Sequence, residues 1–174
     1  CRFYVVSAPY EETVSYEGGT AKGPAALIAA SDQLEHWDGE SIPWHEGIYT
    51  GPVVDCKGEP EEVLGRIEAA VDAAVKNGSI PVTLGGEHTV SLAPLRALVK
   101  HYGSNFGIVH FDAHGDLRYS YDGTIYSHGC VMRRACELNL KLFQIGIRSL
   151  CEEEEEFRKE YGVNHLDGLE LARM

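Results

Sequence analysis

The sequence lacks long hydrophobic runs and an excess of positive charge. No stretch approaches the roughly 20 apolar residues of a membrane-spanning helix. Acidic residues number 27 against 15 lysines and arginines, which gives a formal net charge of −12. Nucleic-acid phosphates need a basic face, so this balance argues against nucleic acid as a ligand. We therefore predict no membrane and no nucleic-acid partner.

Paired cysteines are also missing. The five cysteines are scattered, and none forms a C-x-x-C pair. This pattern is typical of reduced thiols in a cytoplasmic protein, and we predict that location. The sequence contains no internal repeat and no low-complexity linker, and 174 residues is a one-domain length. We predict a single domain over residues 1–174.

What the sequence does contain is an alternation of short apolar runs and helical patterns. The clearest helix is predicted over residues 60–77, where Val63, Ile67, Val71 and Ala74 recur at helical spacing. The other predicted helices cover residues 23–34, 92–102, 130–138 and a segment that follows Ser149 and runs to about residue 161. The predicted strands cover 2–7, 52–56, 80–84, 106–111, 142–147 and 163–166. This alternation favours an α/β fold with a mostly parallel sheet covered on both faces.

The start of the predicted helix that follows Ser149 is rich in glutamate. Ser149 and Glu152 have the spacing of a capping box. The glutamates at 152–156 are predicted to be solvated, because negative charge is favourable at a helix N-terminus.

Three metal-ligand residue types follow the apolar run at 106–111. Asp112, His114 and Asp116 are spaced i, i+2, i+4, so they would point to the same side of an extended chain. Two carboxylates and an imidazole on one side of a strand end are typical of a metal site.

Two further histidines lie in glycine-containing turns. His88 follows Gly85 and Gly86 at the end of the apolar run 80–84, where the glycines permit a sharp turn. Strand ends of this kind carry the ligand sites of open α/β sheets. His128 lies between Ser127 and Gly129, ahead of a helical segment.

Together these segments resemble motifs of the ureohydrolase family, which includes arginase and agmatinase. The segments are Gly85-Gly86-Glu87-His88, Phe111-Asp112-Ala113-His114-Gly115-Asp116 and Ser127-His128-Gly129. Weaker similarity extends through most of the chain, and agmatinase is the closest match. The resemblance implies an arginase-like, three-layer α/β/α fold with the metal site at the C-terminal ends of the strands.

The resemblance also implies roles for individual residues. His88, Asp112, His114 and Asp116 would bind two Mn²⁺ ions per complete subunit, with Asp112 bridging them, and His128 would be the catalytic, proton-shuttling residue. Two such ions can hold one water as hydroxide, which attacks the guanidinium carbon. The expected enzyme hydrolyses a small cationic guanidino substrate, agmatine, to putrescine and urea in polyamine biosynthesis. A homo-oligomer, trimer or hexamer, is also implied.

One part of the family pattern is absent. The family completes its site with a later Asp-x-Asp and a guanidinium-binding glutamate, and neither is found before Met174. We therefore expect the chain to be an N-terminal portion of such an enzyme, with a fold incomplete at the C-terminus.

Several alternatives stay open. Arg118, two residues after Asp116, would favour a guanidino acid such as guanidinobutyrate if it faced the pocket, and agmatine if it paired with Asp122 or another acid. A catalytically inactive metal-binding relative is a further alternative. The zinc-dependent deacetylases have a related fold and an Asp-x-His pair, but His88 together with Asp116 favours two metals. A cysteine hydrolase using Cys130 and His128 is the weakest alternative, because such partners normally come from distant positions.

Overall fold

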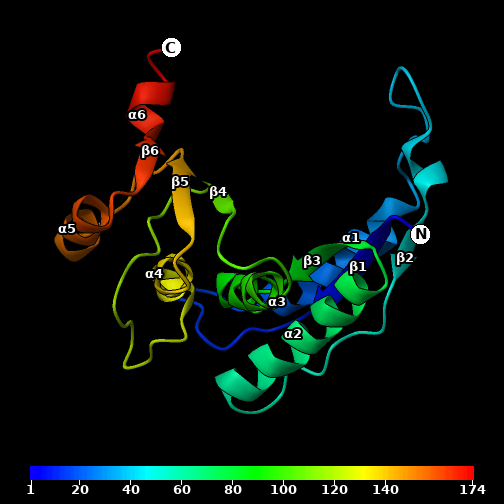
Figure 1. Cartoon of the computed structure of the whole chain (residues 1–174), viewed down its shortest axis with the longest axis horizontal. Coiled ribbons are helices and arrows are strands. Elements are labelled where there is room, and N and C mark those ends of the chain that lie inside the picture. Colours follow the sequence, from blue (N-terminus) through cyan, green and yellow to red (C-terminus); the bar gives the residue numbers. More distant parts are fainter. The chain divides into compact units, whose positions relative to one another are not determined.

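The computed structural model describes residues 1–174, which divide into two compact units, Cys1–Leu98 and Val99–Met174. Each unit is built around its own three-stranded sheet, and all strand pairs in both sheets are parallel (Figure 1). The predicted α/β class is therefore seen in each unit. None of the helices combines the length and the apolar composition needed to cross a membrane.

The first unit has the strand order β2-β1-β3. Helices α1 and α2 pack against β1 and β3. The apolar stripe of α2 supplies much of the core, where Val63, Ile67 and Val71 are fully buried. The elements are β1 (Phe3–Ala8), η1 (Thr20–Lys22), α1 (Gly23–Ser31), η2 (Pro43–Glu46), β2 (Ile48–Thr50), α2 (Pro60–Lys76), β3 (Ile80–Gly85) and η3 (His88–Ser91). Helix α3 (Leu92–Tyr102) begins in this unit and ends in the next.

The second unit has the strand order β4-β5-β6, and α4 packs against β5. Its elements are β4 (Gly107–Phe111), η4 (His128–Cys130), α4 (Val131–Glu137), β5 (Lys141–Ile145), α5 (Glu152–Tyr161), β6 (Asn164–Leu166) and α6 (Gly168–Leu171). Because β4, β5 and β6 are parallel, their C-terminal ends meet at one edge of the sheet.

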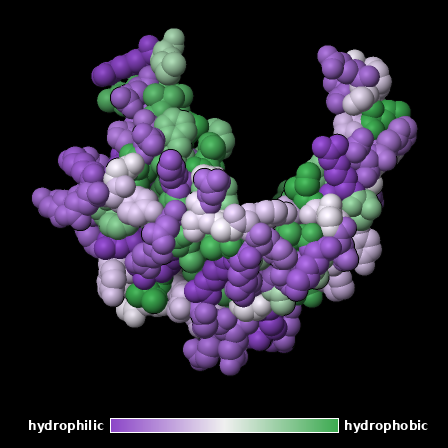
Figure 2. Space-filling view, in the orientation of Figure 1, coloured by the Kyte–Doolittle hydropathy of each residue, from purple (hydrophilic) through white to green (hydrophobic).

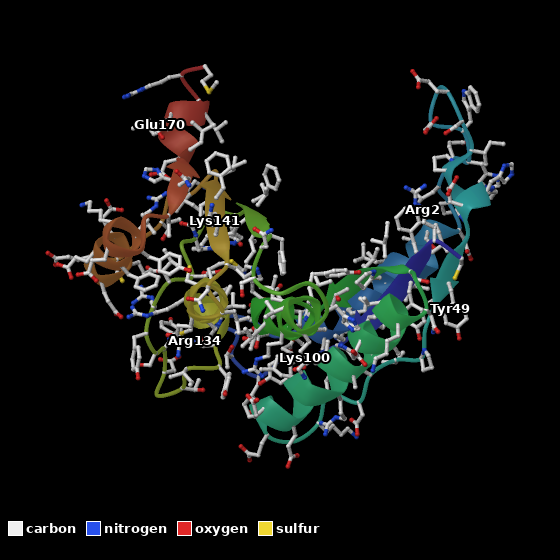
Figure 3. All side chains as sticks on the ribbon, viewed as in Figure 1. Arg2, Tyr49, Lys100, Arg134, Lys141 and Glu170 are labelled. Carbon is white, nitrogen blue, oxygen red and sulfur yellow. The ribbon has the colours of Figure 1, made fainter.

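The two faces of this second sheet differ. His110, Leu142 and Gln144 are buried on one face. On the other face Val109 is 58% and Phe111 75% exposed. Figure 2 shows hydrophobic surface where β4 and β5 lie. Lys141, the first residue of β5, is labelled in Figure 3. The buried polar side chains His110 and Gln144 therefore lie on the face opposite to Val109 and Phe111.

Most predicted elements are confirmed to within a few residues, but the strand predicted at 52–56 is wrong. The second strand is β2, which ends at Thr50. Gly51 and Val54 still donate backbone hydrogen bonds to β1, at Val5 and Ser7. Pro52, between them, has no N–H to donate, so a regular ladder does not continue.

Candidate metal centre

The segment after β4 continues alongside β5 beyond the last strand residue. Asp112 N donates to the carbonyl of Ile145 at 3.1 Å. The carbonyl of Ala113 then accepts from the N–H groups of Arg148 and Ser149, at 2.9 and 3.0 Å. The turn Gly146–Ser149 therefore holds the backbone of Asp112 and Ala113 in place. This turn needs Gly146, whose φ is +90°.

The direction of the chain changes at Asp116. Its φ is +54°, a left-handed conformation that aspartate tolerates better than most residues. Its carbonyl accepts from Met132 N at 3.0 Å and Arg133 N at 3.2 Å, both in the first turn of α4. The N-terminal end of α4 therefore fixes the backbone of a predicted metal ligand.

Glu154 of α5 holds the next residue, and its burial corrects the prediction of a solvated glutamate run. The side chain is 3% exposed. Its Oε1 accepts from Leu117 N at 3.0 Å, and its Oε2 accepts from Cys151 N at 2.9 Å. Glu154 thus ties the loop after Asp116 to the start of α5. The predicted capping pair Ser149–Glu152 is replaced by Cys151 and Glu154.

Potential ligand atoms gather at this corner of the second unit. Those of His110, Asp112 and Asp116 lie within 4.8 Å of one another. His110 and Asp116 are buried, whereas the Asp112 side chain is 25% exposed. Carboxylate oxygens with imidazole nitrogen form the donor set that suits Mn²⁺ and related divalent ions. The two carboxylates therefore fit a divalent metal, and His110, which the sequence patterns did not single out, lies beside them.

His114 does not join this group. Its side chain is 66% exposed, and its Nδ1 lies 3.3 Å from Asp112 Oδ1. Its backbone N–H donates to the same oxygen at 2.8 Å, which helps to orient Asp112. The extended backbone assumed from the i, i+2, i+4 spacing does not persist, because β4 ends at Phe111 and the chain turns at Asp116. The metal-ligand role of His114 stays a prediction.

His88 lies in the first unit, in the turn after β3. Gly85 and Gly86 form this turn, and a Cβ on Gly86 would overlap the carbonyl oxygen of Tyr10. That carbonyl accepts from Glu87 N at 2.9 Å. The two glycines thus permit the close approach that was predicted for them.

The carboxylate of Glu87 stabilises the same turn. It accepts from Thr89 N at 2.8 Å, from Thr89 Oγ1 at 2.7 Å and from Thr13 Oγ1 at 2.9 Å. Glu87 is buried, and its side-chain bonds join this turn to Thr13, so it has a structural role beside His88. The participation of His88 in a metal site stays a prediction.

His128 lies in η4, directly before α4. Its ring and the Tyr121 ring form a T-shaped pair with a centroid distance of 5.3 Å, and its Nδ1 is 3.4 Å from Ser127 Oγ. The neighbouring Cys130 is buried, and burial raises the pKa of its thiol to about 11. Thiolates, not thiols, are nucleophiles, so this environment disfavours the cysteine-hydrolase alternative.

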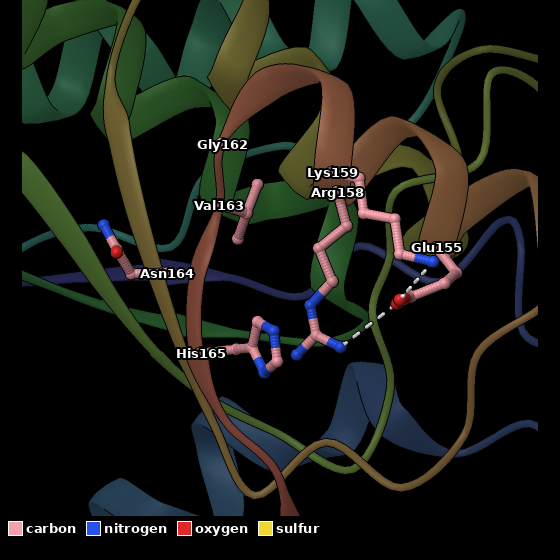
Figure 4. Close-up of a pocket in the computed structure, with 7 residues that line it drawn as sticks. All are labelled: Glu155, Arg158, Lys159, Gly162, Val163, Asn164 and His165. Atoms are coloured by element: carbon pink, nitrogen blue, oxygen red, sulfur yellow. Dashed lines mark hydrogen bonds and ion pairs between the residues drawn. The ribbon is translucent and has the colours of Figure 1, made fainter.

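A separate pocket of about 280 Å³ lies between α5 and β6 (Figure 4). Its lining includes Arg158, Lys159 and His165. The two longer cations are already engaged: Arg158 pairs with Asp167 and Glu155, and Lys159 pairs with Glu155 at 3.0 Å. Both cations are paired with acids of the same unit, and we assign no ligand to this pocket.

Comparison with known proteins gives consistent matches over the whole chain. The model of the Arginase family matches residues 1–174. The N(1)-aminopropylagmatine ureohydrolase of Synechocystis is 38% identical over 97% of this chain and 58% of its own length. The agmatinase of Bacillus subtilis is 35% identical over 94% of this chain and 57% of its own length.

The agmatine ureohydrolase structure of Thermoplasma volcanium superimposes with a TM-score of 0.87, at 31% identity over 99% of this chain and 59% of that one. These matches confirm the predicted arginase-like α/β/α fold. The chain spans about 58% of the length of the Synechocystis relative, as expected for an N-terminal portion.

Proposed function

The chain belongs to the arginase family, and from this premise we propose that the complete protein is a manganese-dependent hydrolase that cleaves agmatine to putrescine and urea. The single observation that carries the proposal is the corner after β4. There Asp112 and Asp116 are held by β5, α4 and α5 with their carboxylates beside one another. We also propose that both compact units belong to one domain over residues 1–174.

The proposed ligands are His88, Asp112, His114 and Asp116, with two Mn²⁺ ions per complete subunit and Asp112 shared between them. When bound, such ions supply an activated water at neutral pH. The exposed ring of His114 is accessible to a second ion, and its N–H bond to Asp112 Oδ1 holds that carboxylate in a fixed orientation.

His128 is the proposed proton shuttle. Imidazole gives and takes protons near neutral pH more readily than other side chains. The Tyr121 ring and the hydroxyl of Ser127 lie against the imidazole and restrict its rotation. A proton carrier must deliver the proton along a defined path, and a restricted ring suits this role.

The environment of Arg118 supports a substrate with a cationic tail. Its Nε lies 3.9 Å from Glu154 Oε2, and its guanidinium lies 5.3 Å from the centre of the Tyr121 ring. From the sequence, Arg118 could pair with Asp122 or with another acid, and the acid found beside it is Glu154. A charge engaged in this way is less available to attract a carboxylate tail, which favours agmatine over guanidinobutyrate.

Two relatives extend the range of candidate substrates. One is named an agmatinase and the other an N(1)-aminopropylagmatine ureohydrolase, so aminopropylagmatine is the second candidate. A role in polyamine and putrescine biosynthesis, a cytoplasmic location and a homo-oligomer of three or six subunits complete the proposal.

The test is a comparison of kcat/KM for agmatine, aminopropylagmatine, arginine and guanidinobutyrate, measured on the complete protein with Mn²⁺. We expect agmatine or its aminopropyl derivative to lead. A preference for guanidinobutyrate would overturn the assignment of the substrate tail. No urea from any of the four, with manganese bound, would identify a catalytically inactive relative.

A further inference from the structure

Two buried polar side chains lie beneath the β4 corner, and neither has a role in the proposed reaction. His110 on β4 and Gln144 on β5 are directly opposite one another in the parallel register. His110 is 5% exposed and Gln144 is fully buried. A buried amide needs a partner, so the contacts of Gln144 show what it orients.

The carbonyl of Gly115 determines which way the Gln144 amide faces. Gly115 O lies 2.7 Å from the Gln144 amide group, and a carbonyl oxygen can only accept. The atom facing it must therefore be the nitrogen, Nε2. This same nitrogen is 3.2 Å from His110 Nδ1. Since an amide nitrogen carries two hydrogens, it donates one to Gly115 and the other to His110.

This arrangement determines where the proton of the His110 ring lies. A nitrogen that accepts a hydrogen bond carries no proton, so the neutral ring has its proton on Nε2. Nε2 lies 3.3 Å from Asp112 Oδ2, although the two are not aligned as a full hydrogen bond. A protonated ring nitrogen has no lone pair with which to bind a metal ion.

We propose that Gln144 fixes His110 in the Nε2–H tautomer, so that His110 positions Asp112 and is itself not a metal ligand. The inference rests on the proposed metal site and assigns two positioning residues to it. Asp112 is then contacted at each oxygen: His114 N donates to Oδ1, and the Nε2–H group of His110 lies 3.3 Å from Oδ2. Its orientation is set before an ion arrives, and each oxygen keeps a lone pair for the metal.

The first experiment measures the tautomer directly. In the metal-free complete protein labelled with ¹⁵N-histidine, His110 should show a pyridine-type Nδ1 and a pyrrole-type Nε2, assigned by their loss in His110→Gln. In Gln144→Glu a carboxylate faces Nδ1, which should move the proton to that nitrogen. A protonated Nδ1 in the wild type, or an unchanged tautomer in Gln144→Glu, would overturn the proposal.

The second experiment measures Mn²⁺ affinity by calorimetry. Gln144→Leu keeps the shape and removes the donor, and we expect affinity to fall about 10–100-fold, as is usual when a group orienting a metal ligand is lost. The matched control is Gln33→Leu at an exposed position, which should bind as the wild type does. Equal affinity of wild type and Gln144→Leu would show that His110 does not position Asp112.

The two proposals fail separately. A wild type that binds no Mn²⁺ and releases no urea contradicts the proposed function, whereas the tautomer measurement needs neither metal nor turnover.

Discussion

Two strand-end corners, one in each unit, are stabilised by a buried glutamate, and each glutamate joins a nearby residue to a distant one. After β3, Glu87 bonds to Thr89, two residues away, and to Thr13, 74 residues away. After β4, the corner containing Asp112 and Asp116 has no such residue of its own. Glu154, 37 residues beyond Leu117, supplies the bonds from another helix.

The two corners differ in the chemistry of these bonds. Glu87 accepts from one backbone N–H and from two hydroxyls, and hydroxyls can also accept. Glu154 accepts from two backbone N–H groups, which can only donate. The first corner is therefore adaptable, because a hydroxyl can reverse its hydrogen bond, whereas the second is strict, because a backbone N–H cannot.

The largest effect is expected at the strict corner from Asp112→Ala. This substitution removes the carboxylate proposed to be shared by both ions, so manganese content should fall well below two per chain and turnover should be lost. Metal analysis of the complete protein is the measurement, with the exposed Asp32→Ala as the control. Retention of two tightly bound ions would contradict the proposed site.

His128→Asn should have the next largest effect. Because His128 is proposed to move protons and not to bind metal, the variant should retain manganese while kcat falls on the order of 10²–10⁴-fold. His36→Asn, at an exposed position, is the control. An unchanged kcat would mean that His128 has only a structural role.

Glu154→Gln and Glu87→Gln test the comparison itself. At 154 an amide NH₂ must face a backbone N–H, and the unsatisfied buried donor should cost about 1–3 kcal/mol of unfolding free energy. At 87 the NH₂ can face the Thr13 hydroxyl, so the cost should be about 1 kcal/mol or less. Denaturant titration measures both, with exposed Glu156→Gln as the reference. Equal losses at 87 and 154 would contradict the distinction between the corners.

The smallest effect concerns a third strand end, that of β6, where Asp167 is held by Arg158 of α5. Hydrogen bonds from the Arg158 guanidinium hold the pKa of the Asp167 carboxyl below its usual value of 3.8. The stabilisation is therefore present above pH 3.8 and is lost as the pH falls through the lowered pKa.

The unfolding free energies of wild type and Asp167→Asn should accordingly converge in acid. Denaturation of both proteins at a series of pH values measures this, and a constant difference down to low pH would show that Arg158 does not act on this carboxyl.

The parts of the fold that the sequence predicted are those with local signals. Helix α2 follows from its apolar stripe and β3 from its apolar run, and the turn at Gly85 and Gly86 follows from the glycines themselves. Asp112 and Asp116 were recognisable as candidate ligands because their residue types and spacing are contiguous. The arginase-family match supports the same segments.

The parts that escaped prediction depend on contacts between distant segments. Glu154 is one of five consecutive glutamates, and only the position of Leu117 N determines which of them is buried. From the sequence alone, His110 is an ordinary strand residue. Its contact with Gln144, 34 residues later, is seen only in the folded sheet. No periodicity in the chain encodes either pairing.

The close approach of Gly86 to the backbone of Tyr10 restricts which amino acids position 86 can accept. Any other amino acid brings a Cβ against the Tyr10 carbonyl, and that carbonyl also anchors the backbone of Glu87. A substitution would displace two segments together, with no flexible side-chain end to move aside. In a saturation library selected for the folded protein, this codon should return glycine alone, while neighbouring surface codons drift freely.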